Sequence, residues 1–128
     1  MADVFPNLKE ADHVSVATRR RDGAQVWTPV WFVIVDERLF FRTLQESGKI
    51  KRIRRWPEVE LAPCTAEGEI TGPTGPGFAR VLEPDDPLIP AADSELQKRY
   101  GAARDEMTRS YGHVGFQYVV IQPGPASA

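Results

Sequence analysis

A short run of basic residues is the strongest chemical signal in this sequence. Five of the seven residues between Lys49 and Arg55 are lysine or arginine, and Thr43, Ser47 and Gly48 come shortly before them. Hydroxyl groups and free backbone N–H groups at the start of a helix favour an anion. Three charge-assisted contacts to a phosphate, each worth about 1.5–3 kcal/mol, would be enough for micromolar binding. A solvated, charged helix face is the alternative interpretation.

Other kinds of chemistry have weaker support in the sequence. The two histidines, His13 and His113, lie far apart and have no spaced carboxylate motif, so no metal site is indicated. The single cysteine, Cys64, excludes an intrachain disulfide, and without a nearby histidine we interpret it as a small core residue. Residues 72–77 contain two prolines and no lysine, which does not match a phosphate-binding loop.

Length and composition predict one folded domain over residues 1–128. The chain has 41% hydrophobic and 27% charged residues, and we expect residues 1–10 and 123–128 to form a flexible leader and tail. A net charge of -2 argues against a nucleic-acid-binding protein. No apolar run approaches the ~20 residues that span a membrane, and no signal peptide is visible, so we expect a cytoplasmic protein without a membrane role.

The first half of the chain reads as strands joined by tight turns. Residues 13–17 alternate in polarity, and Asp22 and Gly23 predict a hairpin to a second strand over residues 25–35. Pro29 interrupts this strand and predicts a sheet edge, a bulge, or a place where something other than a strand faces the backbone. A turn at Asp36 and Glu37 leads to a third strand over residues 38–43.

A helix and further strands follow. The spacing of Ile50, Ile53 and Trp56 predicts a short helix that is capped by Ser47 and anchored in the core by Trp56. We expect further strands at residues 58–65, 69–71, 78–82 and 114–121, a loop at 72–77, and a second helix that begins near Ser94. The predicted fold is mostly β: an antiparallel barrel or sandwich of six or seven strands with two short helices. A small-molecule site would then lie in a surface groove or between subunits.

Four motifs, in this order and spacing, resemble a known superfamily. They are residues 28–32 (TPVWF), 39–43 (LFFRT), 47–53 (SGKIKRI) and 57–64 (PEVELAPC). Together they resemble the pyridoxamine 5′-phosphate oxidase-like, FMN-binding split-barrel superfamily, and within it the actinobacterial branch that depends on the deazaflavin coenzyme F420. The resemblance covers residues 13–82, and the remainder of the chain matches only in length and pattern.

The resemblance implies a homodimer of split barrels with two cofactor grooves at the subunit interface. It places the strand from Trp27 to Trp31 along the flavin-like ring. It implies cofactor contacts at Thr28, Pro29, Val30, Trp31, Arg42, Thr43, Ser47, Gly48, Lys49, Lys51, Arg52, Arg55, Pro63 and Cys64. We interpret Trp31, Phe40 and Phe78 as core residues or walls of this groove.

The same resemblance implies an oxidoreductase that transfers a hydride between reduced F420 and an unsaturated small-molecule acceptor. The phosphodiester and polyglutamate tail of F420 need more cationic surface than FMN, which favours F420 here. Vitamin B6 oxidation is disfavoured, because the Arg-x-His substrate motif of those oxidases is missing after Arg109. Tyr118, His113 and bound water are candidate proton donors. The alternatives are an FMN-dependent oxidoreductase of the same fold and a non-catalytic protein that binds the cofactor, heme or another tetrapyrrole.

Overall fold

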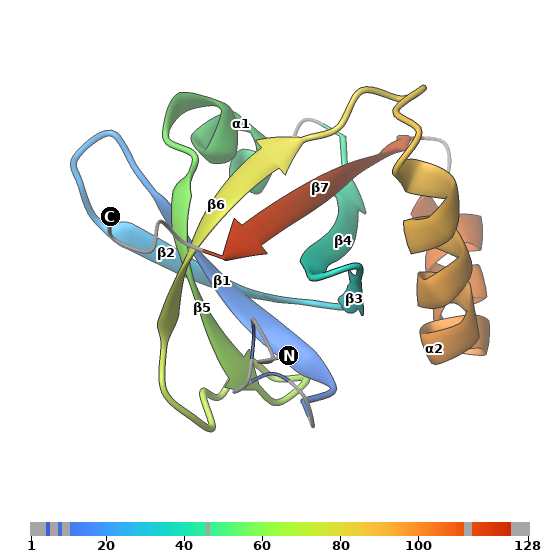
Figure 1. Ribbon diagram of the computed structural model, residues 1–128, viewed down its shortest axis with the longest axis horizontal. Helices are drawn as coiled ribbons and strands as arrows, with labels where there is room; N and C mark the ends of the chain where they lie inside the picture. The colour runs from blue at the N-terminus through green and yellow to red at the C-terminus, as the bar shows by residue number, and fades with distance from the viewer. Residues whose placement is uncertain (1–4, 6–7, 9–10, 46, 112–113, 124–128) are drawn as a thin grey trace.

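A computed structural model describes residues 5, 8, 11–45, 47–111 and 114–123. The elements follow in the order β1 (His13–Arg19), β2 (Gln25–Val30), β3 (Val33–Val35), β4 (Arg38–Leu44), α1 (Gly48–Arg55), β5 (Glu58–Cys64), β6 (Gly75–Val81), α2 (Ile89–Tyr111) and β7 (Phe116–Pro123). The strands form one antiparallel sheet in the order β2-β1-β5-β6-β7-β4-β3. This sheet curls into a half-barrel (Figure 1). The expected class, an antiparallel split barrel with two helices, is confirmed.

Alternating side chains on the strands build two apolar clusters. On β4, Leu39 and Phe41 point into the barrel, while Phe40 lies on the outer face, where it packs against α2. The barrel interior also contains Val14 and Val16 from β1. The outer cluster joins α2 to β3, β4 and β7. The sheet is therefore buried on both faces where α2 covers it.

Helix α1 forms as the sequence predicts, with one difference in its anchor. The Ser47 hydroxyl accepts a hydrogen bond from the Ile50 backbone N–H at 3.4 Å, which is the geometry of an N-cap. Ile50 and Ile53 are fully buried in the barrel. Trp56, expected to be the core anchor, is only half-buried and caps the C-terminal end of the helix instead.

The prediction of one long strand over residues 25–35 is wrong, because the chain leaves the sheet after Val30. The backbone of Phe32 hydrogen-bonds to side chains of α2. Its N–H donates to the Tyr100 hydroxyl at 3.0 Å, and its carbonyl accepts from Arg99 Nη1 at 2.8 Å. These side chains replace a neighbouring strand, which divides the segment into β2 and β3. Pro29 lies on β2, an edge strand, as its missing N–H predicts.

Two expectations about residues 69–82 are also wrong. Strand β6 begins at Gly75, inside the segment expected to be a loop, and Gly77 pairs with Val59. The strand has a glycine at this position because a Cβ there would come within 2.7 Å of the Ile121 side chain. Residues 69–71 form only an isolated bridge, between Ile70 and Cys64. Phe78 is 44% exposed and does not line the pocket described below, so it is not a core residue of this chain.

Helix α2 differs most from expectation. It begins at Ile89, before Ser94, and Gly101 interrupts it with φ +37° and ψ -108°. Positive φ suits glycine, which lacks a Cβ. The two helical segments on either side of Gly101 lie next to each other beside β7 and β4 (Figure 1). The single helix expected from near Ser94 is therefore two helical segments, with Leu96 on the first and Met107 on the second.

The end of the chain follows the expected alternation. Val120 lies in the cluster with α2 and Tyr118 packs against that cluster, while Val119 and Ile121 lie in the barrel. Among the described residues, no helix is both long enough and apolar enough to cross a membrane. His113 and most of the expected leader and tail lie outside the described residues.

Candidate functional site

The candidate site is a pocket of about 440 Å³ that lies where the edge strand β2 approaches β4, α1 and α2. Strand β2 ends the sheet, so one side of its backbone is not paired with another strand. The lining residues come from six elements and two connecting segments. They are His13, Pro29, Val30, Trp31, Arg42, Thr43, Leu44, Lys49, Ala66, Leu96, Arg104, Met107, Tyr111 and Phe116.

One wall of the pocket is held rigidly by α2. The Trp31 ring stacks on the Tyr100 ring, with centroids 5.0 Å apart and an interplanar angle of 12°. The Tyr100 hydroxyl also donates to the Asp12 carbonyl at 2.7 Å, and burial raises the pKa of Tyr100. The neutral phenol therefore ties three segments together and fixes Trp31 as a flat apolar surface.

Lys49 is the cation at the α1 side of the pocket. It is half-buried in the first turn of the helix and has no ion-pair or hydrogen-bond partner among the described residues. Burial lowers the pKa of Lys49, and the nearby charge of Arg52 lowers it further. The first N–H groups of a helix also lack intrahelical partners. The charge and the donors together favour an anion at this end of the pocket.

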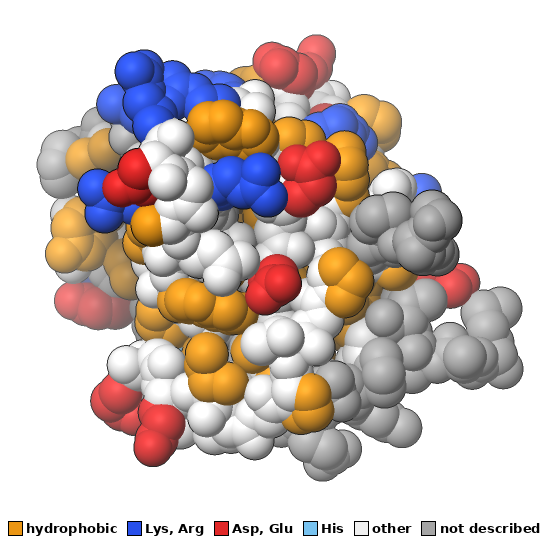
Figure 2. Space-filling model, turned by 90° about the vertical axis from the view of Figure 1, so that its left-hand side faces the viewer, with side chains coloured by type: hydrophobic (Ala, Val, Ile, Leu, Met, Phe, Trp, Pro, Cys, Tyr) orange, Lys and Arg blue, Asp and Glu red, His pale blue; other side chains and the backbone are white. Residues whose placement is uncertain are grey.

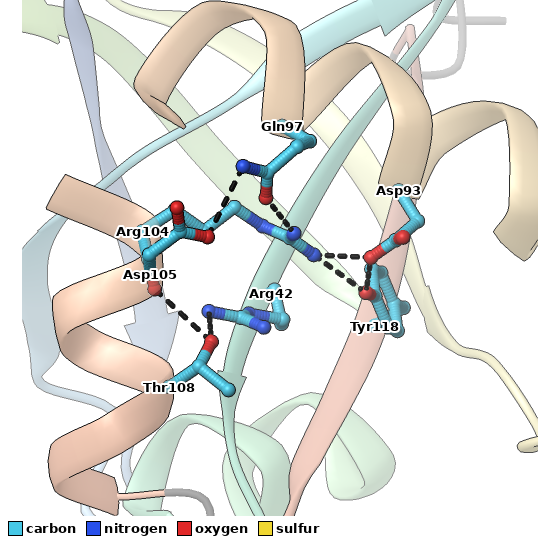
Figure 3. A network of polar contacts seen from close by, with 7 residues as sticks. All are labelled: Arg42, Asp93, Gln97, Arg104, Asp105, Thr108 and Tyr118. Atoms are coloured by element: carbon cyan, nitrogen blue, oxygen red, sulfur yellow. Dashed lines mark hydrogen bonds and ion pairs between the residues drawn. The ribbon is translucent and has the colours of Figure 1, made fainter. Parts of the chain in front are cut away.

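A network of polar side chains lies under α2 and is built on Arg104 (Figure 3). Only 7% of Arg104 is exposed, and its guanidinium donates to Asp93, to the Tyr118 hydroxyl at 3.0 Å and to Gln97 Oε1 at 2.6 Å. Tyr118 in turn donates to Asp93. These contacts hold the two segments of α2 to each other and to β7.

Arg42 lies beside this network and has only neutral partners. Its Nη2 donates to Thr108 Oγ1 at 3.2 Å, and its guanidinium lies 3.9 Å from the centre of the Phe116 ring. Burial lowers the pKa of Arg42, and the charge of Arg104 lowers it further. Arg42 thus brings a positive charge to the pocket without a carboxylate in direct contact.

Three buried polar side-chain atoms at the pocket or on the adjoining strand β2 have no hydrogen-bond partner among the described residues. They are His13 Nδ1, Thr28 Oγ1 and Arg104 Nε. His13 lines the pocket, and Thr28 is on the adjoining strand β2. Buried polar atoms normally have a partner, and an exception often marks a place where a ligand or water binds.

A separate hollow of about 450 Å³ lies between α1 and the β1–β2 turn. Figure 2 shows lysine and arginine side chains gathered toward the top of the molecule, where α1 lies. Arg52 is oriented there by a 2.6 Å hydrogen bond from its Nε to the buried Thr18 hydroxyl. The lining residues are Arg19, Arg20, Arg21, Asp22, Lys51, Arg52 and Arg55.

The structure brings six of the fourteen expected site residues into the pocket: Pro29, Val30, Trp31, Arg42, Thr43 and Lys49. Lys51, Arg52 and Arg55 line the basic hollow instead. Ser47 caps α1, and a Cβ at Gly48 would meet the Arg52 guanidinium. Thr28 adjoins the pocket on β2.

The other two expected site residues, Pro63 and Cys64, lie at the buried end of β5, where Cys64 pairs with His13. Burial raises the pKa of Cys64, which suits the core role that its isolation in the sequence predicts.

Sequence reasoning missed the contribution of α2 to the pocket. Leu96 reaches the pocket from the first segment of α2, and Arg104, Met107 and Tyr111 reach it from the segment that follows the turn at Gly101. A glycine between two helical patterns was the available signal. Tyr118, a candidate proton donor, does not line the pocket. Burial and its hydrogen bond to Asp93 raise its pKa, which keeps its proton in the network.

The sequence matches no protein-family model, and it has no significant match among curated proteins. Solved structures with a similar fold exist. The heme storage protein HutZ from Vibrio cholerae gives a TM-score of 0.72 at 18% identity, over 96% of this chain and 89% of that one. A pyridoxamine 5′-phosphate oxidase-related, FMN-binding protein from Nostoc punctiforme gives 0.63 at 18%, over 94% and 76%. An F420 reductase gives 0.60 at 20%, over 94% and 93%.

These likenesses define the class of fold. The chain has the fold of the pyridoxamine 5′-phosphate oxidase-like, FMN-binding split barrels, as the sequence motifs predict. The similar structures belong to proteins with different descriptions: a heme storage protein, an FMN-binding protein and an F420 reductase. At identities of 20% or less, the comparison establishes the fold, and function must be argued from the site.

Proposed function

We propose that this chain is an oxidoreductase that holds coenzyme F420 in the pocket and passes a hydride between it and an unsaturated small molecule. The observation that carries the proposal is Lys49, a half-buried cation at the start of α1 that has no partner in the described part of the chain. Its neighbours in the pocket are an unpaired strand edge and apolar side chains. This combination suits a planar molecule with an anionic group at one end.

Different residues of the pocket would contact different parts of the cofactor. The unpaired edge of β2 offers N–H and C=O groups to the polar rim of a flat ring, and Trp31 offers an apolar face. Lys49 and the first N–H groups of α1 would hold the phosphate. The bound deazaflavin supplies the hydride, while the chain orients the acceptor and excludes water with Leu96 and Met107.

The basic hollow supports F420 over FMN as the cofactor. Arg52, on the same helix as Lys49, lies close enough to lower the pKa of Lys49, so positive charge continues from the pocket toward the hollow. A phosphodiester with a polyglutamate tail carries more negative charge than FMN and would use this additional cationic surface. FMN remains the alternative cofactor for the same pocket, and a direct titration distinguishes the two.

The proposal also includes a homodimer in which a second copy completes the groove. The sequence motifs imply this assembly, and several large apolar side chains are exposed on the described surface, among them Ile34, Ile70, Phe78 and Val114. Light scattering of the purified chain is expected to give twice the monomer mass. A monomer at micromolar concentration would contradict this part of the proposal.

A second candidate function, heme binding, is favoured by His13. This residue lines the pocket with an unpaired buried Nδ1, and an imidazole is a suitable axial ligand for heme iron. Addition of hemin to the purified chain would then give a Soret band that disappears in His13→Ala. F420 binding without any hemin spectrum would reject this candidate.

The proposed function is tested by titrating the purified chain with F420 and, separately, with FMN. We expect F420 to bind with micromolar or tighter affinity and Lys49→Gln to weaken binding at least tenfold, because one charge-assisted contact is lost. Arg54→Gln is the matched control. Arg54 is exposed on the same helix and lines neither the pocket nor the hollow. The affinity of this variant for F420 should therefore differ less than twofold from that of the wild-type chain.

Two outcomes would reject this assignment. Unchanged affinity in Lys49→Gln would remove Lys49 as the phosphate contact. Binding of neither cofactor at micromolar concentration would remove the oxidoreductase proposal itself.

A further inference from the structure

Arg42 lies on the face of β4 under α2 and has no carboxylate in direct contact among the described residues. Its partners there, the Thr108 hydroxyl and the Phe116 ring, are neutral. The two carboxylates of the neighbouring network have other partners: Asp93 pairs with Arg104, and the exposed Asp105 accepts a hydrogen bond from Gln97.

Arg42 and Lys49 form two separate cationic centres on the same pocket. Successive residues of a strand point to opposite faces, so Arg42 lies on the α2 side of β4 and the neighbouring Thr43 on the barrel side, toward α1. The electrostatics agree with this division. Arg104 perturbs the pKa of Arg42, whereas Arg52 perturbs the pKa of Lys49. A molecule at Lys49 consequently leaves the charge at Arg42 available to a second anion.

The surroundings of Arg42 indicate which anion fits. A guanidinium without a carboxylate partner matches the two oxygens of a carboxylate. The neighbouring pocket walls, Leu96, Met107 and Phe116, suit an apolar, flat group attached to it. We propose that Arg42 is the subsite for a carboxylate of the acceptor, which makes the substrate class planar conjugated carboxylic acids. This inference rests on the proposed function.

Arg104 serves this subsite as a positioning residue. Its bonds to Asp93 and Tyr118 fix the second segment of α2, which carries Thr108 to Arg42. Thr108, the partner of Arg42, is itself held by a 3.0 Å hydrogen bond from its hydroxyl to the Arg104 backbone carbonyl. The Arg42 guanidinium is thereby fixed before a ligand arrives.

The experiment compares trans-cinnamate with its methyl ester, because methylation removes the carboxylate charge and keeps the planar conjugated skeleton. Binding to the wild-type chain is measured by calorimetry, with and without F420. We expect cinnamate to bind at least tenfold more tightly than the ester, and Arg42→Met to abolish this preference. Arg38→Met is the matched control, since Arg38 is on the same strand and outside the pocket lining, and it should keep the preference.

The outcomes separate this inference from its alternatives. Equal affinity for acid and ester on the wild-type chain overturns it, and this comparison needs no variant. If Arg42→Met weakens F420 binding tenfold and the preference for cinnamate is absent, Arg42 binds the cofactor phosphate and the inference is also overturned. A preference for cinnamate in a chain that fails to bind F420 supports the carboxylate subsite and rejects the proposed function.

Discussion

Lys49 occupies a position that is unfavourable for the stability of α1. A helix N-terminus carries partial positive charge, so a cation in the first turn is repelled, and this turn contains no acidic residue to offset it. Burial adds a second cost, which is seen in the lowered pKa of Lys49. A bound anion would remove both costs. This unfavourable position is the reason that we assign Lys49 to binding rather than to the structure of the helix.

The lowered pKa of Lys49 predicts a pH dependence of cofactor binding. An anion favours the charged ammonium, so binding raises this pKa and takes up a proton. Affinity should be full below the lowered pKa and fall as pH rises through it, at a lower pH than the ordinary lysine value of 10.5 implies. Titrations of F420 over a pH series should show this fall in the wild-type chain and not in Lys49→Gln. An identical slope in both proteins would contradict the assignment, because titration of the cofactor itself affects both equally.

The sequence identified Lys49, Thr43 and the residues around Pro29 but not His13 or Arg104. The first group lies in local patterns: a basic run behind a capping serine, and a proline inside a strand. Arg104 reaches the pocket through the turn at Gly101 and its contacts with Asp93 and Tyr118. Such long-range contacts leave no short-range signal in one sequence.

At the scale of the elements, α2 depends on its internal polar network. Burial alone would raise the pKa of Asp93, but the hydrogen bond from Tyr118 and the charge of Arg104 lower it more, so the net shift is downward. Ionised Asp93 therefore stabilises the fold above the unfolded-state pKa of about 3.9, and this contribution is lost as pH falls through the folded-state value.

Asp93→Asn tests this network. We expect a loss of about 1–2 kcal/mol in the free energy of unfolding at neutral pH, since the 45% exposure of the Asp93 side chain screens the pair. Urea unfolding at acidic pH should show a smaller difference from wild type. Asp105→Asn, an exposed carboxylate that accepts only from Gln97, is the control. A difference that does not depend on pH would exclude the ion pair as its source.

The packing of strand β6 depends on Gly77, although the glycine and proline content of residues 72–77 predicts a loop there. Gly77→Ala would place a Cβ 2.7 Å from Ile121 Cγ2 and 3.3 Å from Val59 Cγ2. Overpacking of this kind costs about 1–3 kcal/mol. Gly75→Ala, on the same strand with no atom within 4 Å of its Cβ, should change the free energy of unfolding by less than about 0.5 kcal/mol. Equal effects of the two variants in denaturant unfolding would contradict the packing explanation.

At the scale of the whole molecule, the sheet order places the candidate site. Strands β2 and β3 are the two ends of the sheet, and β2 ends beside β4 at the pocket. Strand polarity and turn residues predict the antiparallel class, because each hairpin is local. The break after Val30 and the return of α2 over β4 depend on Tyr100 and Arg99, which lie far along the chain. Sequence patterns therefore anticipate the barrel better than they anticipate its pocket.

The central claim is that one pocket holds the ring of a redox cofactor against β2 and its phosphate against α1. A crystal structure of the chain grown with F420 tests this most directly. We expect the ring along residues 29–31, beside Trp31, and the phosphate within hydrogen-bond distance of Lys49. Cofactor bound away from the β2 edge, or a phosphate held by Arg52 and Arg55 in the basic hollow with the pocket empty, would contradict the account.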